Sequence, residues 1–351
     1  MKVLVFGAGP LGSLMAARLH DAGHDVTVLA RNQRLADIRE HGIVIREDGS
    51  EKSEVARVKS VETLGPDDEY DLVMIVMRKN QVDEIVETLA ANRRVPTFLF
   101  MTNCAEGPGR YMDAIGSERV MLGFPLPGGH REGHVVEVVP VNEQHVWTIP
   151  VGEADGRITE RTRLVARTLG SMRGYKVQIR RDMDAWLRHH VALLMPAFAP
   201  ALYAAEISMK RMGRTRDLNV LAVRGMKEAI RGLKKAGVPI SPGAFKIVFL
   251  FPEPLLVHLV SRMMKAEKNR ASIEGHPKNA REELRYLTEE LLRFLKRKGI
   301  STPVCDSLFA YYDPDTPPMP DGSRKIPLRW AGVLVPLALI AAIVAAFVAI
   351  M

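Results

Sequence analysis

The sequence predicts an α/β Rossmann domain with a parallel sheet, followed by an all-α domain and one apolar C-terminal helix. Three observations support this prediction. Over the first 180 residues, short apolar runs alternate with amphipathic segments, which is typical of parallel strands joined by crossover helices. From about residue 183 to residue 310, long amphipathic segments have helical spacing. The last 21 residues, 331–351, carry no charge.

Within the first domain, the apolar runs are expected to be strands and the amphipathic segments between them helices. The expected strands are residues 2–6, 25–30, 71–76 and 97–101, with two short strands about the turn at Asp48-Gly49 and extended chain over 120–151; the expected helices are 10–22, 33–41 and 81–90. The predicted parts of the whole chain are a Rossmann domain (1–180), a helical domain (181–312), a proline-rich spacer (313–330) and a membrane helix (331–351).

The apolar C-terminal segment is long enough to span a bilayer. At 1.5 Å per residue, its 21 residues cover about the 30 Å of a hydrocarbon core. Trp330 stands where an interfacial aromatic residue would, and Arg324, Lys325 and Arg329 precede it. We therefore expect a tail anchor whose basic flank keeps the rest of the chain on the cytoplasmic side. The alternative is a buried C-terminal helix, which would need apolar cover on every side.

Composition argues against several functions. The net charge is +8, but there is no zinc-finger spacing and no basic run interleaved with aromatic residues, so nucleic-acid binding is not expected. Cys104 and Cys305 are far apart, which indicates a reducing compartment and argues against a disulfide framework or structural zinc. The histidines form no ligand cluster in the sequence, and we assign no metal.

A glycine-rich loop follows the first expected strand and opens the first helix, the context in which a GxGxxG pattern predicts dinucleotide binding. Gly7 allows the tight turn, Gly9 lets the backbone approach a pyrophosphate, and Gly12 lets the helix pack close to the sheet. Pro10 and Leu11 open the helix, whose first N–H groups and dipole hold the phosphates. A purely structural glycine turn is the alternative.

The residues after the second strand favour NADPH over NADH. An NAD site usually has Asp or Glu at the end of this strand to bind the ribose hydroxyls. This chain has Ala30 followed by Arg31, with Arg34 close by, and a guanidinium can pair with a 2′-phosphate in a bidentate manner. We predict that Arg31 and Arg34 bind NADPH; for Arg31, the alternative is an ordinary solvated loop arginine.

With these features, the chain resembles the ketopantoate reductase family, whose members are NADPH-dependent enzymes that reduce a 2-keto acid to a 2-hydroxy acid. The resemblance covers about residues 1–312. It rests on the GAGPLG loop, Arg31, Arg78-Lys79-Asn80-Gln81, Asn103 within residues 101–107, a helix led by Trp186, and the stretch Gly299 to Pro303. It implies a Rossmann domain followed by a helical domain, with the active site in the cleft between them.

The resemblance also implies roles for single residues. Arg78 stands where the family has a lysine, so a cation near cofactor or substrate is retained. Asn103 matches an asparagine that in the family lies near the nicotinamide and the substrate. Glu283 falls at the family's active-site glutamate, and Ser272 approximates its substrate-carboxylate serine. For Glu283, a solvated, charge-laced helix face is the alternative.

The helix led by Trp186 departs from the family pattern. The family has a catalytic lysine two residues after the tryptophan and asparagines four and eight residues further on, whereas this chain has Arg188, Ala192 and Pro196. An arginine can hold a carboxylate or polarise a carbonyl, but its pKa above about 12 makes it a poor proton donor. His189, on the edge of the same helical face, could supply the proton; the alternative is an ordinary interdomain or surface histidine.

Together these residues predict a membrane-tethered, NADPH-dependent reductase of a 2-keto acid or related small carbonyl compound. Arg188 and Arg78 would orient the acceptor, Asn103 would position substrate and nicotinamide, and His189 or Arg188 would donate the proton or polarise the carbonyl. Because both asparagines are absent, 2-dehydropantoate is not the favoured substrate. Two alternatives stay open: a catalytically decayed NADPH-binding membrane adaptor or sensor, and a reductase of an amphiphilic carbonyl compound at the bilayer. A second copy of the chain is a further candidate partner.

Overall fold

A computed structural model describes residues 1–266, 270–330 and 332, without the side chains of residues 271, 272 and 276. The chain divides into two compact units, Met1–Leu187 and the residues from Arg188 onward. The division falls within helix α6 (Met183–Leu194), a few residues after the expected boundary near residue 180. Each unit has buried hydrophobic clusters of its own.

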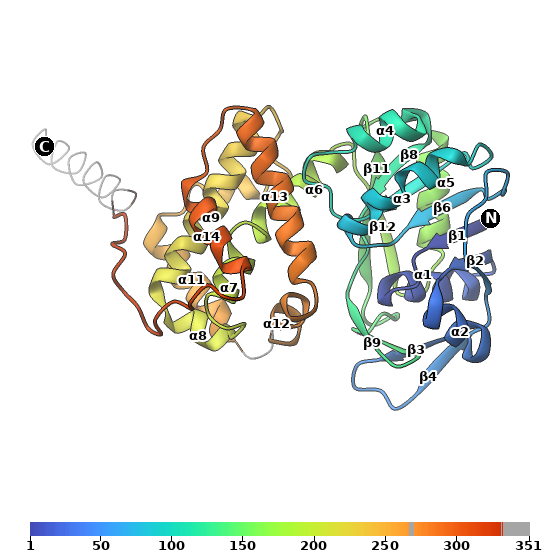
Figure 1. Cartoon of the computed structure of the whole chain (residues 1–351), viewed down its shortest axis with the longest axis horizontal. Helices are drawn as coiled ribbons and strands as arrows, with labels where there is room; N and C mark the ends of the chain where they lie inside the picture. Colours follow the sequence, from blue (N-terminus) through green and yellow to red (C-terminus); the bar gives the residue numbers. More distant parts are fainter. Residues whose placement is uncertain (267–269, 331, 333–351) are drawn as a thin grey trace, which may run out of the picture. The chain divides into compact units, whose positions relative to one another are not determined.

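The first unit is built on an eight-stranded sheet in the order β12-β11-β8-β7-β6-β1-β2-β5 (Figure 1). Every neighbouring pair is parallel except β8 and β11. The strands are β1 (Lys2–Phe6), β2 (Asp25–Leu29), β5 (Lys59–Val61), β6 (Leu72–Ile75), β7 (Phe98–Met101), β8 (Val120–Gly123), β11 (Trp147–Glu153) and β12 (Tyr175–Ile179). The chain winds outward from β1 and then returns to its other side at β6, so the strand order reverses between β1 and β6. The predicted Rossmann-like parallel sheet is confirmed.

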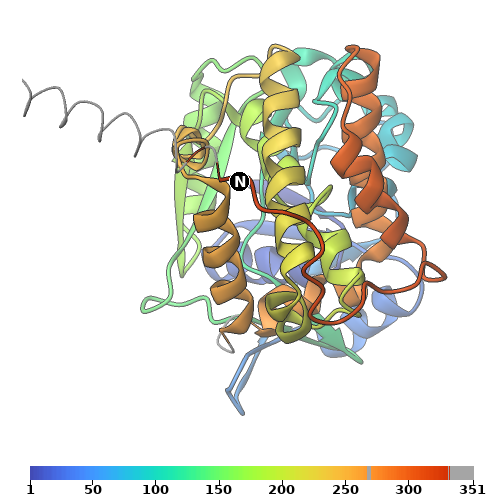
Figure 2. The ribbon, with the colours of Figure 1, turned by 90° about the vertical axis from the view of Figure 1, so that its left-hand side faces the viewer.

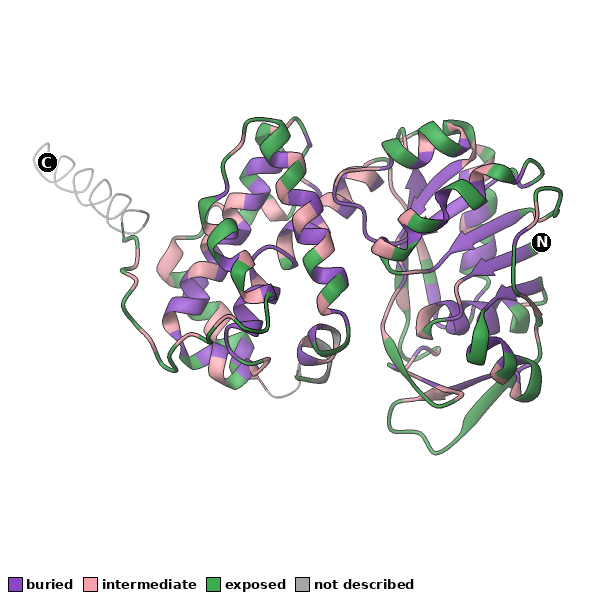
Figure 3. Ribbon diagram, viewed as in Figure 1, coloured by how far each residue is buried: buried purple, intermediate pink, exposed green. Residues whose placement is uncertain are grey.

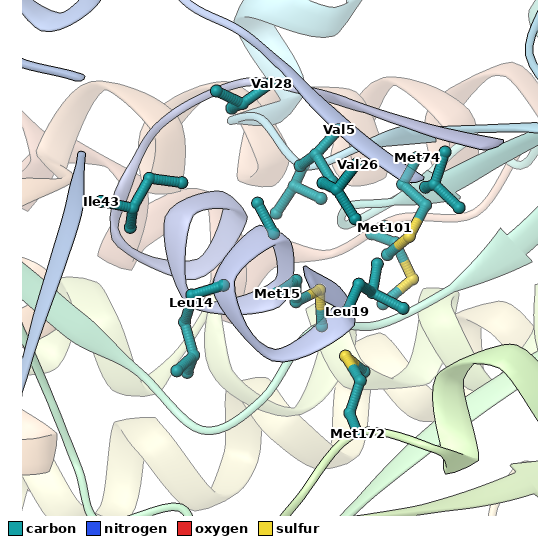
Figure 4. Close-up of a cluster of buried hydrophobic side chains, with 14 of the residues drawn as sticks. Val5, Leu14, Met15, Leu19, Val26, Val28, Ile43, Met74, Met101 and Met172 are labelled. Carbon is teal, nitrogen blue, oxygen red and sulfur yellow. The ribbon is translucent and has the colours of Figure 1, made fainter. Parts of the chain in front are cut away.

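Alternate side chains of the sheet face two different cores. Val3 and Val5 of β1 join a cluster with helices α1 (Pro10–Asp21) and α5 (Glu160–Gly170), and Figure 4 shows Val5 near the side chains of α1. Leu4 and Phe6 join a cluster with α3 (Lys79–Ala91) and α4 (Gly109–Ile115). Because both faces are covered, the central strands are almost continuously apolar and buried, as the purple arrows of Figure 3 show.

A second, four-stranded sheet has the order β4-β3-β10-β9. Its strands are β3 (Ile43–Glu47), β4 (Ser53–Ala56), β9 (Gly129–Glu132) and β10 (Val135–Val138), and α2 (Asn32–His41) precedes it in the chain. Strands β3 and β4 flank the predicted turn, and β9 and β10 form part of the stretch predicted to be extended. Val136 and Val138 are buried in the same cluster as α1, so one face of this sheet packs towards that helix.

The second unit is helical in its described residues, as predicted. After α6 come α7 (Phe198–Tyr203), α8 (Met209–Arg214), α9 (Arg216–Lys235), α10 (Phe245–Val248), α11 (Glu253–Lys265), α12 (Arg270–Asn279), α13 (Arg281–Arg297) and α14 (Pro303–Phe309). The apolar faces of α9 and α13 are buried. Tyr312 is buried after α14, where its hydroxyl donates to the carbonyl oxygen of Met195 at 2.5 Å and accepts from Thr288 Oγ1 at 3.1 Å.

Residues 313–330, which we call the strap, follow α14 and contain no helix. They are nevertheless bound to the helical unit. Figure 2 shows the strap in red along the near face of that unit. Asp217 of α9 holds it through the Ser323 hydroxyl at 2.5 Å and the amides of Lys325 and Ile326 at 2.7 and 2.9 Å. Further on, the amide of Arg329 donates to Glu253 at 3.0 Å. The predicted spacer is therefore extended but docked on α9 and α11.

The predicted membrane helix at 331–351 lies outside the described residues, apart from Gly332. Within the part of the chain that the structure describes, no helix combines the length and apolarity needed to cross a membrane. A Cβ atom on Gly332 would lie 3.4 Å from the Cβ of Pro252, the residue just before α11. The strap therefore leads to the beginning of α11, where Gly332 lies.

Candidate cofactor and substrate site

The predicted cofactor and substrate residues of the first unit follow the carboxyl ends of four adjacent strands. The residues in register near the ends of β1, β2, β6 and β7 are Phe6, Leu29, Ile75 and Phe100. The glycine loop continues from β1, while Arg31, Arg78 and Asn103 lie two or three residues beyond the other three positions. Ligands of open parallel sheets bind at this edge where the strand order reverses, which here is between β1 and β6.

The glycine loop meets two different constraints. Gly7 has a φ of +116°, and a Cβ on Gly12 would lie 1.9 Å from the Gly7 carbonyl oxygen, so both positions require glycine for the loop to close. A Cβ on Gly9, by contrast, would have no atom within 4 Å. Gly9 is the N-cap of α1 without a side-chain cap, and Pro10 opens the helix. The amides of the first turn, including that of Leu11, can therefore serve an anion in the space beside Gly9.

Arg34, predicted to bind the cofactor, has a different position. It is buried, and its guanidinium donates to the carbonyl oxygens of Ala8 at 3.2 Å and His134 at 3.0 Å. It also donates to Ser13 Oγ at 2.9 Å. Three of its five N–H donors are thus used on the protein itself, and Arg34 supports the glycine loop from beneath. Its contact with the cofactor stays a prediction.

Arg31 is exposed at the N-cap of α2. Among the described residues, its side chain has no hydrogen bond or ion pair, so its guanidinium is available to a ligand. A second arginine, Arg131 of β9, pairs across the sheet with Val136, whose side chain is buried towards α1. Gly129 lies on the same face, since a Cβ there would be 3.4 Å from Pro10 Cβ. Arg131 therefore leaves the edge strand on the side of α1 and the loop.

The positive charge of Arg131 affects Arg34, the residue beneath the glycine loop. Burial first, and then the positive charge of Arg131, lower the pKa of Arg34, although this guanidinium remains charged. The Arg131 side chain is exposed and, within the described residues, makes no hydrogen bond or ion pair. Arg31 and Arg131 thus add two exposed positive charges to the neighbourhood of the glycine loop. The sequence does not single out Arg131, because its closeness to the loop depends on the pairing of β9 with β10.

Arg78 and Lys79 are separated by the start of α3. The Lys79 ammonium is buried, with its Nζ 2.7 and 2.6 Å from the two carboxylate oxygens of Asp83 and 5.3 Å from the centre of the Tyr111 ring. Arg78 is the exposed N-cap residue of that helix. Of the two cations, Arg78 is therefore the one at the ligand-binding edge, whereas Lys79 anchors α3 to α4.

Buried polar atoms without partners lie just after β7. Thr102 and Asn103 are 4% and 8% exposed, and within the described residues neither Thr102 Oγ1 nor Asn103 Oδ1 has a hydrogen-bond partner. An unsatisfied buried polar group costs about 1–3 kcal/mol, so native proteins rarely leave one without a reason. A ligand with hydrogen-bond donors at this edge would satisfy both atoms. The contact of Asn103 with substrate and nicotinamide stays a prediction, which its unsatisfied oxygen suits.

Helix α6 is shorter than expected from the sequence, which placed Arg188, Ala192 and Pro196 on one helix. It ends at Leu194, and Pro196 lies in the turn before α7. Proline lacks the N–H of a helical hydrogen bond and clashes with the preceding turn, which accounts for this end. The prediction that His189 shares one helical face with Ala192 and Pro196 is therefore wrong for Pro196.

Arg188 and His189 occupy different surroundings in the helical unit. The Arg188 guanidinium carbon lies 4.8 Å from the centre of the Phe294 ring on α13, a cation–π contact. His189 is fully buried, with its ring centre 6.4 Å from that of Phe245. Arg188 thus keeps a cation near the end of α13, and His189 is not a surface histidine.

Glu283 lies in the first turn of α13 and is buried, so the alternative of a solvated helix face does not hold for it. Phe294 follows 11 residues later, about 16 Å along the helix axis. Glu283 and the aromatic ring beneath Arg188 are therefore at opposite ends of α13. Ser272 falls within α12, and its side chain lies outside the described part of the structure.

One group of potential metal ligands, His130, Glu132 and Glu137, gathers on the described part of the second sheet. Glu137 accepts there from Arg46 Nε at 2.8 Å and is 3.1 Å from His130. Arg46 already pairs with this carboxylate, so the group does not lead us to assign a metal.

Comparisons with known proteins find similar chains. Residues 3–147 match the family model of ketopantoate reductase PanE/ApbA. The uncharacterized oxidoreductase YkpB of Bacillus subtilis is 23% identical over 315 residues, which cover 88% of this chain and 97% of that protein. The 2-dehydropantoate 2-reductase of Aquifex aeolicus is 25% identical over 317 residues, covering 86% and 93% of the two chains.

Solved structures share the fold over most of the chain. The ternary structure of D-mandelate dehydrogenase with NADH and anilino(oxo)acetate has a TM-score of 0.72 at 15% identity, covering 89% of this chain and 97% of that one. The 2-dehydropantoate 2-reductase of Geobacter metallireducens has a TM-score of 0.70 at 18% identity, covering 89% and 99%.

The fold and the glycine-loop edge define a Rossmann-type sheet unit followed by a helical unit. Over residues 3–147 the chain is similar to the ketopantoate reductase PanE/ApbA family, and over most of its length it is similar to curated oxidoreductases.

Proposed function

We propose that this protein is an NADPH-dependent reductase that adds a hydride to the carbonyl carbon of a 2-keto acid or a related carbonyl compound. The observation that carries the proposal is the convergence of the glycine loop, Arg31, Arg78 and the unsatisfied Asn103 at one edge of the sheet. A nicotinamide dinucleotide needs a phosphate cradle, a ribose contact and a polar nicotinamide pocket, and this edge offers residues for each.

The residues of this edge fit the cofactor's groups. The uncapped start of α1 and the open space beside Gly9 suit a pyrophosphate. The buried oxygens of Asn103 and Thr102 can accept hydrogen bonds from a carboxamide or a ribose hydroxyl. When bound, the reduced cofactor supplies the hydride, and the protein orients the acceptor and protonates the product oxygen.

The preference for NADPH is proposed from Arg31 and Arg131. Neither guanidinium is engaged among the described residues, and a 2′-phosphate carries oxygens that both can bind. D-mandelate dehydrogenase, which shares the fold, was solved with NADH, so the fold alone does not select the phosphate. The two arginines are the feature of this chain that would select it.

The acceptor would be held by cations and protonated by a histidine. Arg78 at the sheet edge and Arg188 in the helical unit can each bind a carboxylate or polarise a carbonyl oxygen. Reduction also needs a proton for the developing alkoxide, and we assign that donation to His189, since arginine is a poor donor. Glu283 and Ser272 are kept as further candidate site residues on the family resemblance.

We place 2-dehydropantoate behind other carbonyl acceptors. The helix α6 offers the buried Ala192 and then ends before Pro196, where the resemblance implies two asparagines. Two polar contacts to the substrate are therefore missing. An acceptor with a less polar body, including an amphiphilic carbonyl compound, fits this change better.

A second function is favoured by the position of Arg188. Its guanidinium lies over the Phe294 ring, and this contact favours a packing role for the side chain over a role in substrate binding. Together with the shortened α6, this suits an NADPH-binding adaptor or sensor that has lost catalysis. We rank it second because the unsatisfied oxygens after β7 still call for a nicotinamide or a substrate.

One experiment separates the two functions. Purified full-length protein in mild detergent is titrated with NADPH and with NADH, and then incubated with NADPH and a panel of 2-keto acids and apolar ketones. The reductase predicts tighter binding of NADPH and its oxidation by at least one acceptor. Tight NADPH binding with no oxidation by any acceptor would instead support the adaptor.

We further propose that residues 331–351 anchor the protein in a membrane, with the body on the cytoplasmic side. The proposal rests on 21 uncharged residues preceded by Trp330 and the basic strap end.

A further inference from the structure

An apolar surface lies on α10, α11 and the turn between them, close to the point where the described chain ends. Half of the exposed large hydrophobic side chains in the described part of the protein fall within residues 247–263. They are Ile247, Leu250, Phe251, Leu255, Leu259 and Met263, which we call the α10–α11 patch. Leu250 is the most exposed of them, at 80%.

The patch continues an apolar face that the helical unit only partly covers. Leu256, Val257 and Met264 of α11 are buried, the first two against Val220 and Val223 of α9. Leu255, Leu259 and Met263 recur every four residues, so they form one stripe along the same helix. The apolar face of α11 is therefore wider than the part of it that neighbouring helices cover.

The strap brings Arg329, Trp330 and Gly332 to the beginning of α11, next to this patch. Arg329 donates its amide to Glu253 in the first turn of α11, and Gly332 lies beside Pro252. Trp330, between them, is half exposed. Because the strap is held by Asp217, Arg224 and Glu253, the exit point is fixed at α11 and does not swing on a free linker.

The charges around the patch are basic. Its only described acid, Glu253, is paired with Arg224 at 2.7 Å, while Lys246, Arg262 and Lys265 of α10 and α11 are exposed. The end of the strap adds the exposed cations Arg324, Lys325 and Arg329. An apolar surface with a cationic rim matches an interface of acyl chains and anionic headgroups.

We propose that the α10–α11 patch is a membrane-contact surface, which inserts into the headgroup region of an anionic bilayer beside the anchor. This rests on the proposed membrane anchor at 331–351. The bilayer is the occupant that the exit point favours, since a segment crossing a membrane from Gly332 brings α11 to within a few residues of the lipid surface. The helical unit is then held on the membrane by two contacts.

Single-cysteine labelling tests this surface in the full-length protein. Leu259→Cys, and separately Leu255→Cys, carries an environment-sensitive fluorophore; Cys104 and Cys305 are buried and are expected not to react. Leu164→Cys is the matched control, because Leu164 is an equally exposed helical leucine of α5 (42%, against 46% for Leu259). The protein is reconstituted in vesicles with and without anionic lipid, and lipids with a nitroxide high on the acyl chain serve as quenchers.

The expected result is quenching and a blue shift at residues 255 and 259, stronger with anionic lipid, and neither at residue 164. Protein that floats with the vesicles while residues 255 and 259 stay unquenched would overturn the contact surface but leave the anchor standing. Protein that fails to float would remove the anchor and the surface together. Labels at residues 255 and 259 that are already shielded from solvent without lipid would also overturn the proposal. Shielding that depends on protein concentration would indicate a second copy of the chain as the occupant. Shielding that does not depend on it would indicate residues 331–351. NADPH oxidation in the same samples reports separately on the reductase.

Discussion

Arg34 Nε donates to the carbonyl oxygen of Ala8 at 3.2 Å, beneath the middle of the glycine loop. The same guanidinium bonds Ser13 of α1 and His134 in the turn between β9 and β10. One buried side chain thus ties the loop, the first helix and the second sheet together. The cofactor cradle is therefore held by a residue that need not touch the cofactor.

Replacing Arg34 should weaken both cofactors alike. Arg34→Met keeps the length of the side chain but removes three hydrogen bonds, so the loop loosens and calorimetric titration should show similar losses for NADPH and NADH. Arg31→Met is the matched comparison, because it should weaken NADPH alone, by about 10- to 100-fold if one charge-assisted bond is lost. A loss confined to NADPH in Arg34→Met would show that Arg34 binds the 2′-phosphate after all.

Two glycines of the loop should behave oppositely. In Gly12→Ala, the new methyl group would meet the Gly7 carbonyl oxygen, so the cofactor-free protein should lose about 3 kcal/mol or more of its unfolding free energy. Gly9→Ala faces open space and should leave that stability unchanged while weakening dinucleotide binding. Thermal unfolding without cofactor, followed by titration, measures both. Equal destabilisation by the two variants would contradict the described loop.

Much of the first unit could be predicted because its signals are local. The apolar runs and the glycine loop mark β1, α1, β2, β6 and β7 to within a few residues. The sequence did not lead us to predict β5, α4, α5 and β12. Strand β5 has three residues, α4 has seven, and β12 alternates buried and exposed positions at the sheet edge, so their apolar signal is weak.

The site was less predictable because its residues depend on long-range pairing. Arg31 was proposed from its place after a strand, and Asn103 from the family resemblance. The position of Arg34 in the sequence suggests a cofactor ligand, but its guanidinium donates to the carbonyl oxygens of Ala8 and His134 inside the protein. Arg131 becomes relevant only once β9 lies beside α1. Pro196 was the one local signal that should have shortened α6 in advance.

The strap should come loose at low pH. Burial raises the pKa of Asp217, but the hydrogen bonds from Ser323 and from the amides of Ile326 and Lys325 outweigh it, so the net shift is downward. A carboxyl with a lowered folded-state pKa stabilises the fold above its unfolded pKa, near 4, and loses this contribution as pH falls through the folded value.

Asp217→Asn should therefore cost about 2 kcal/mol at neutral pH and make stability depend less steeply on pH below about 4. Urea unfolding across this range measures both effects. Asp315→Asn, on an exposed carboxyl of the same strap, is the control and should change neither. An Asp217→Asn profile that parallels the parent protein would show that the strap is held by other contacts.

Proton donation by His189 should appear in kcat and in its pH dependence. His189→Gln keeps a polar side chain but cannot donate a proton in the same way, so kcat should fall about 100-fold, and one limb of the pH–rate profile should disappear. His190→Gln next to it should retain both. If His189→Gln kept the profile of the parent protein, the proton would have to come from another group.

NADPH oxidation by the full-length protein with a panel of 2-keto acids and apolar ketones tests the central claim most directly. We predict saturable, acceptor-dependent turnover at about 1 per second or faster, with NADH at least about tenfold poorer in kcat/KM. Tight NADPH binding without turnover on any acceptor would contradict the reductase and leave a nucleotide-binding protein.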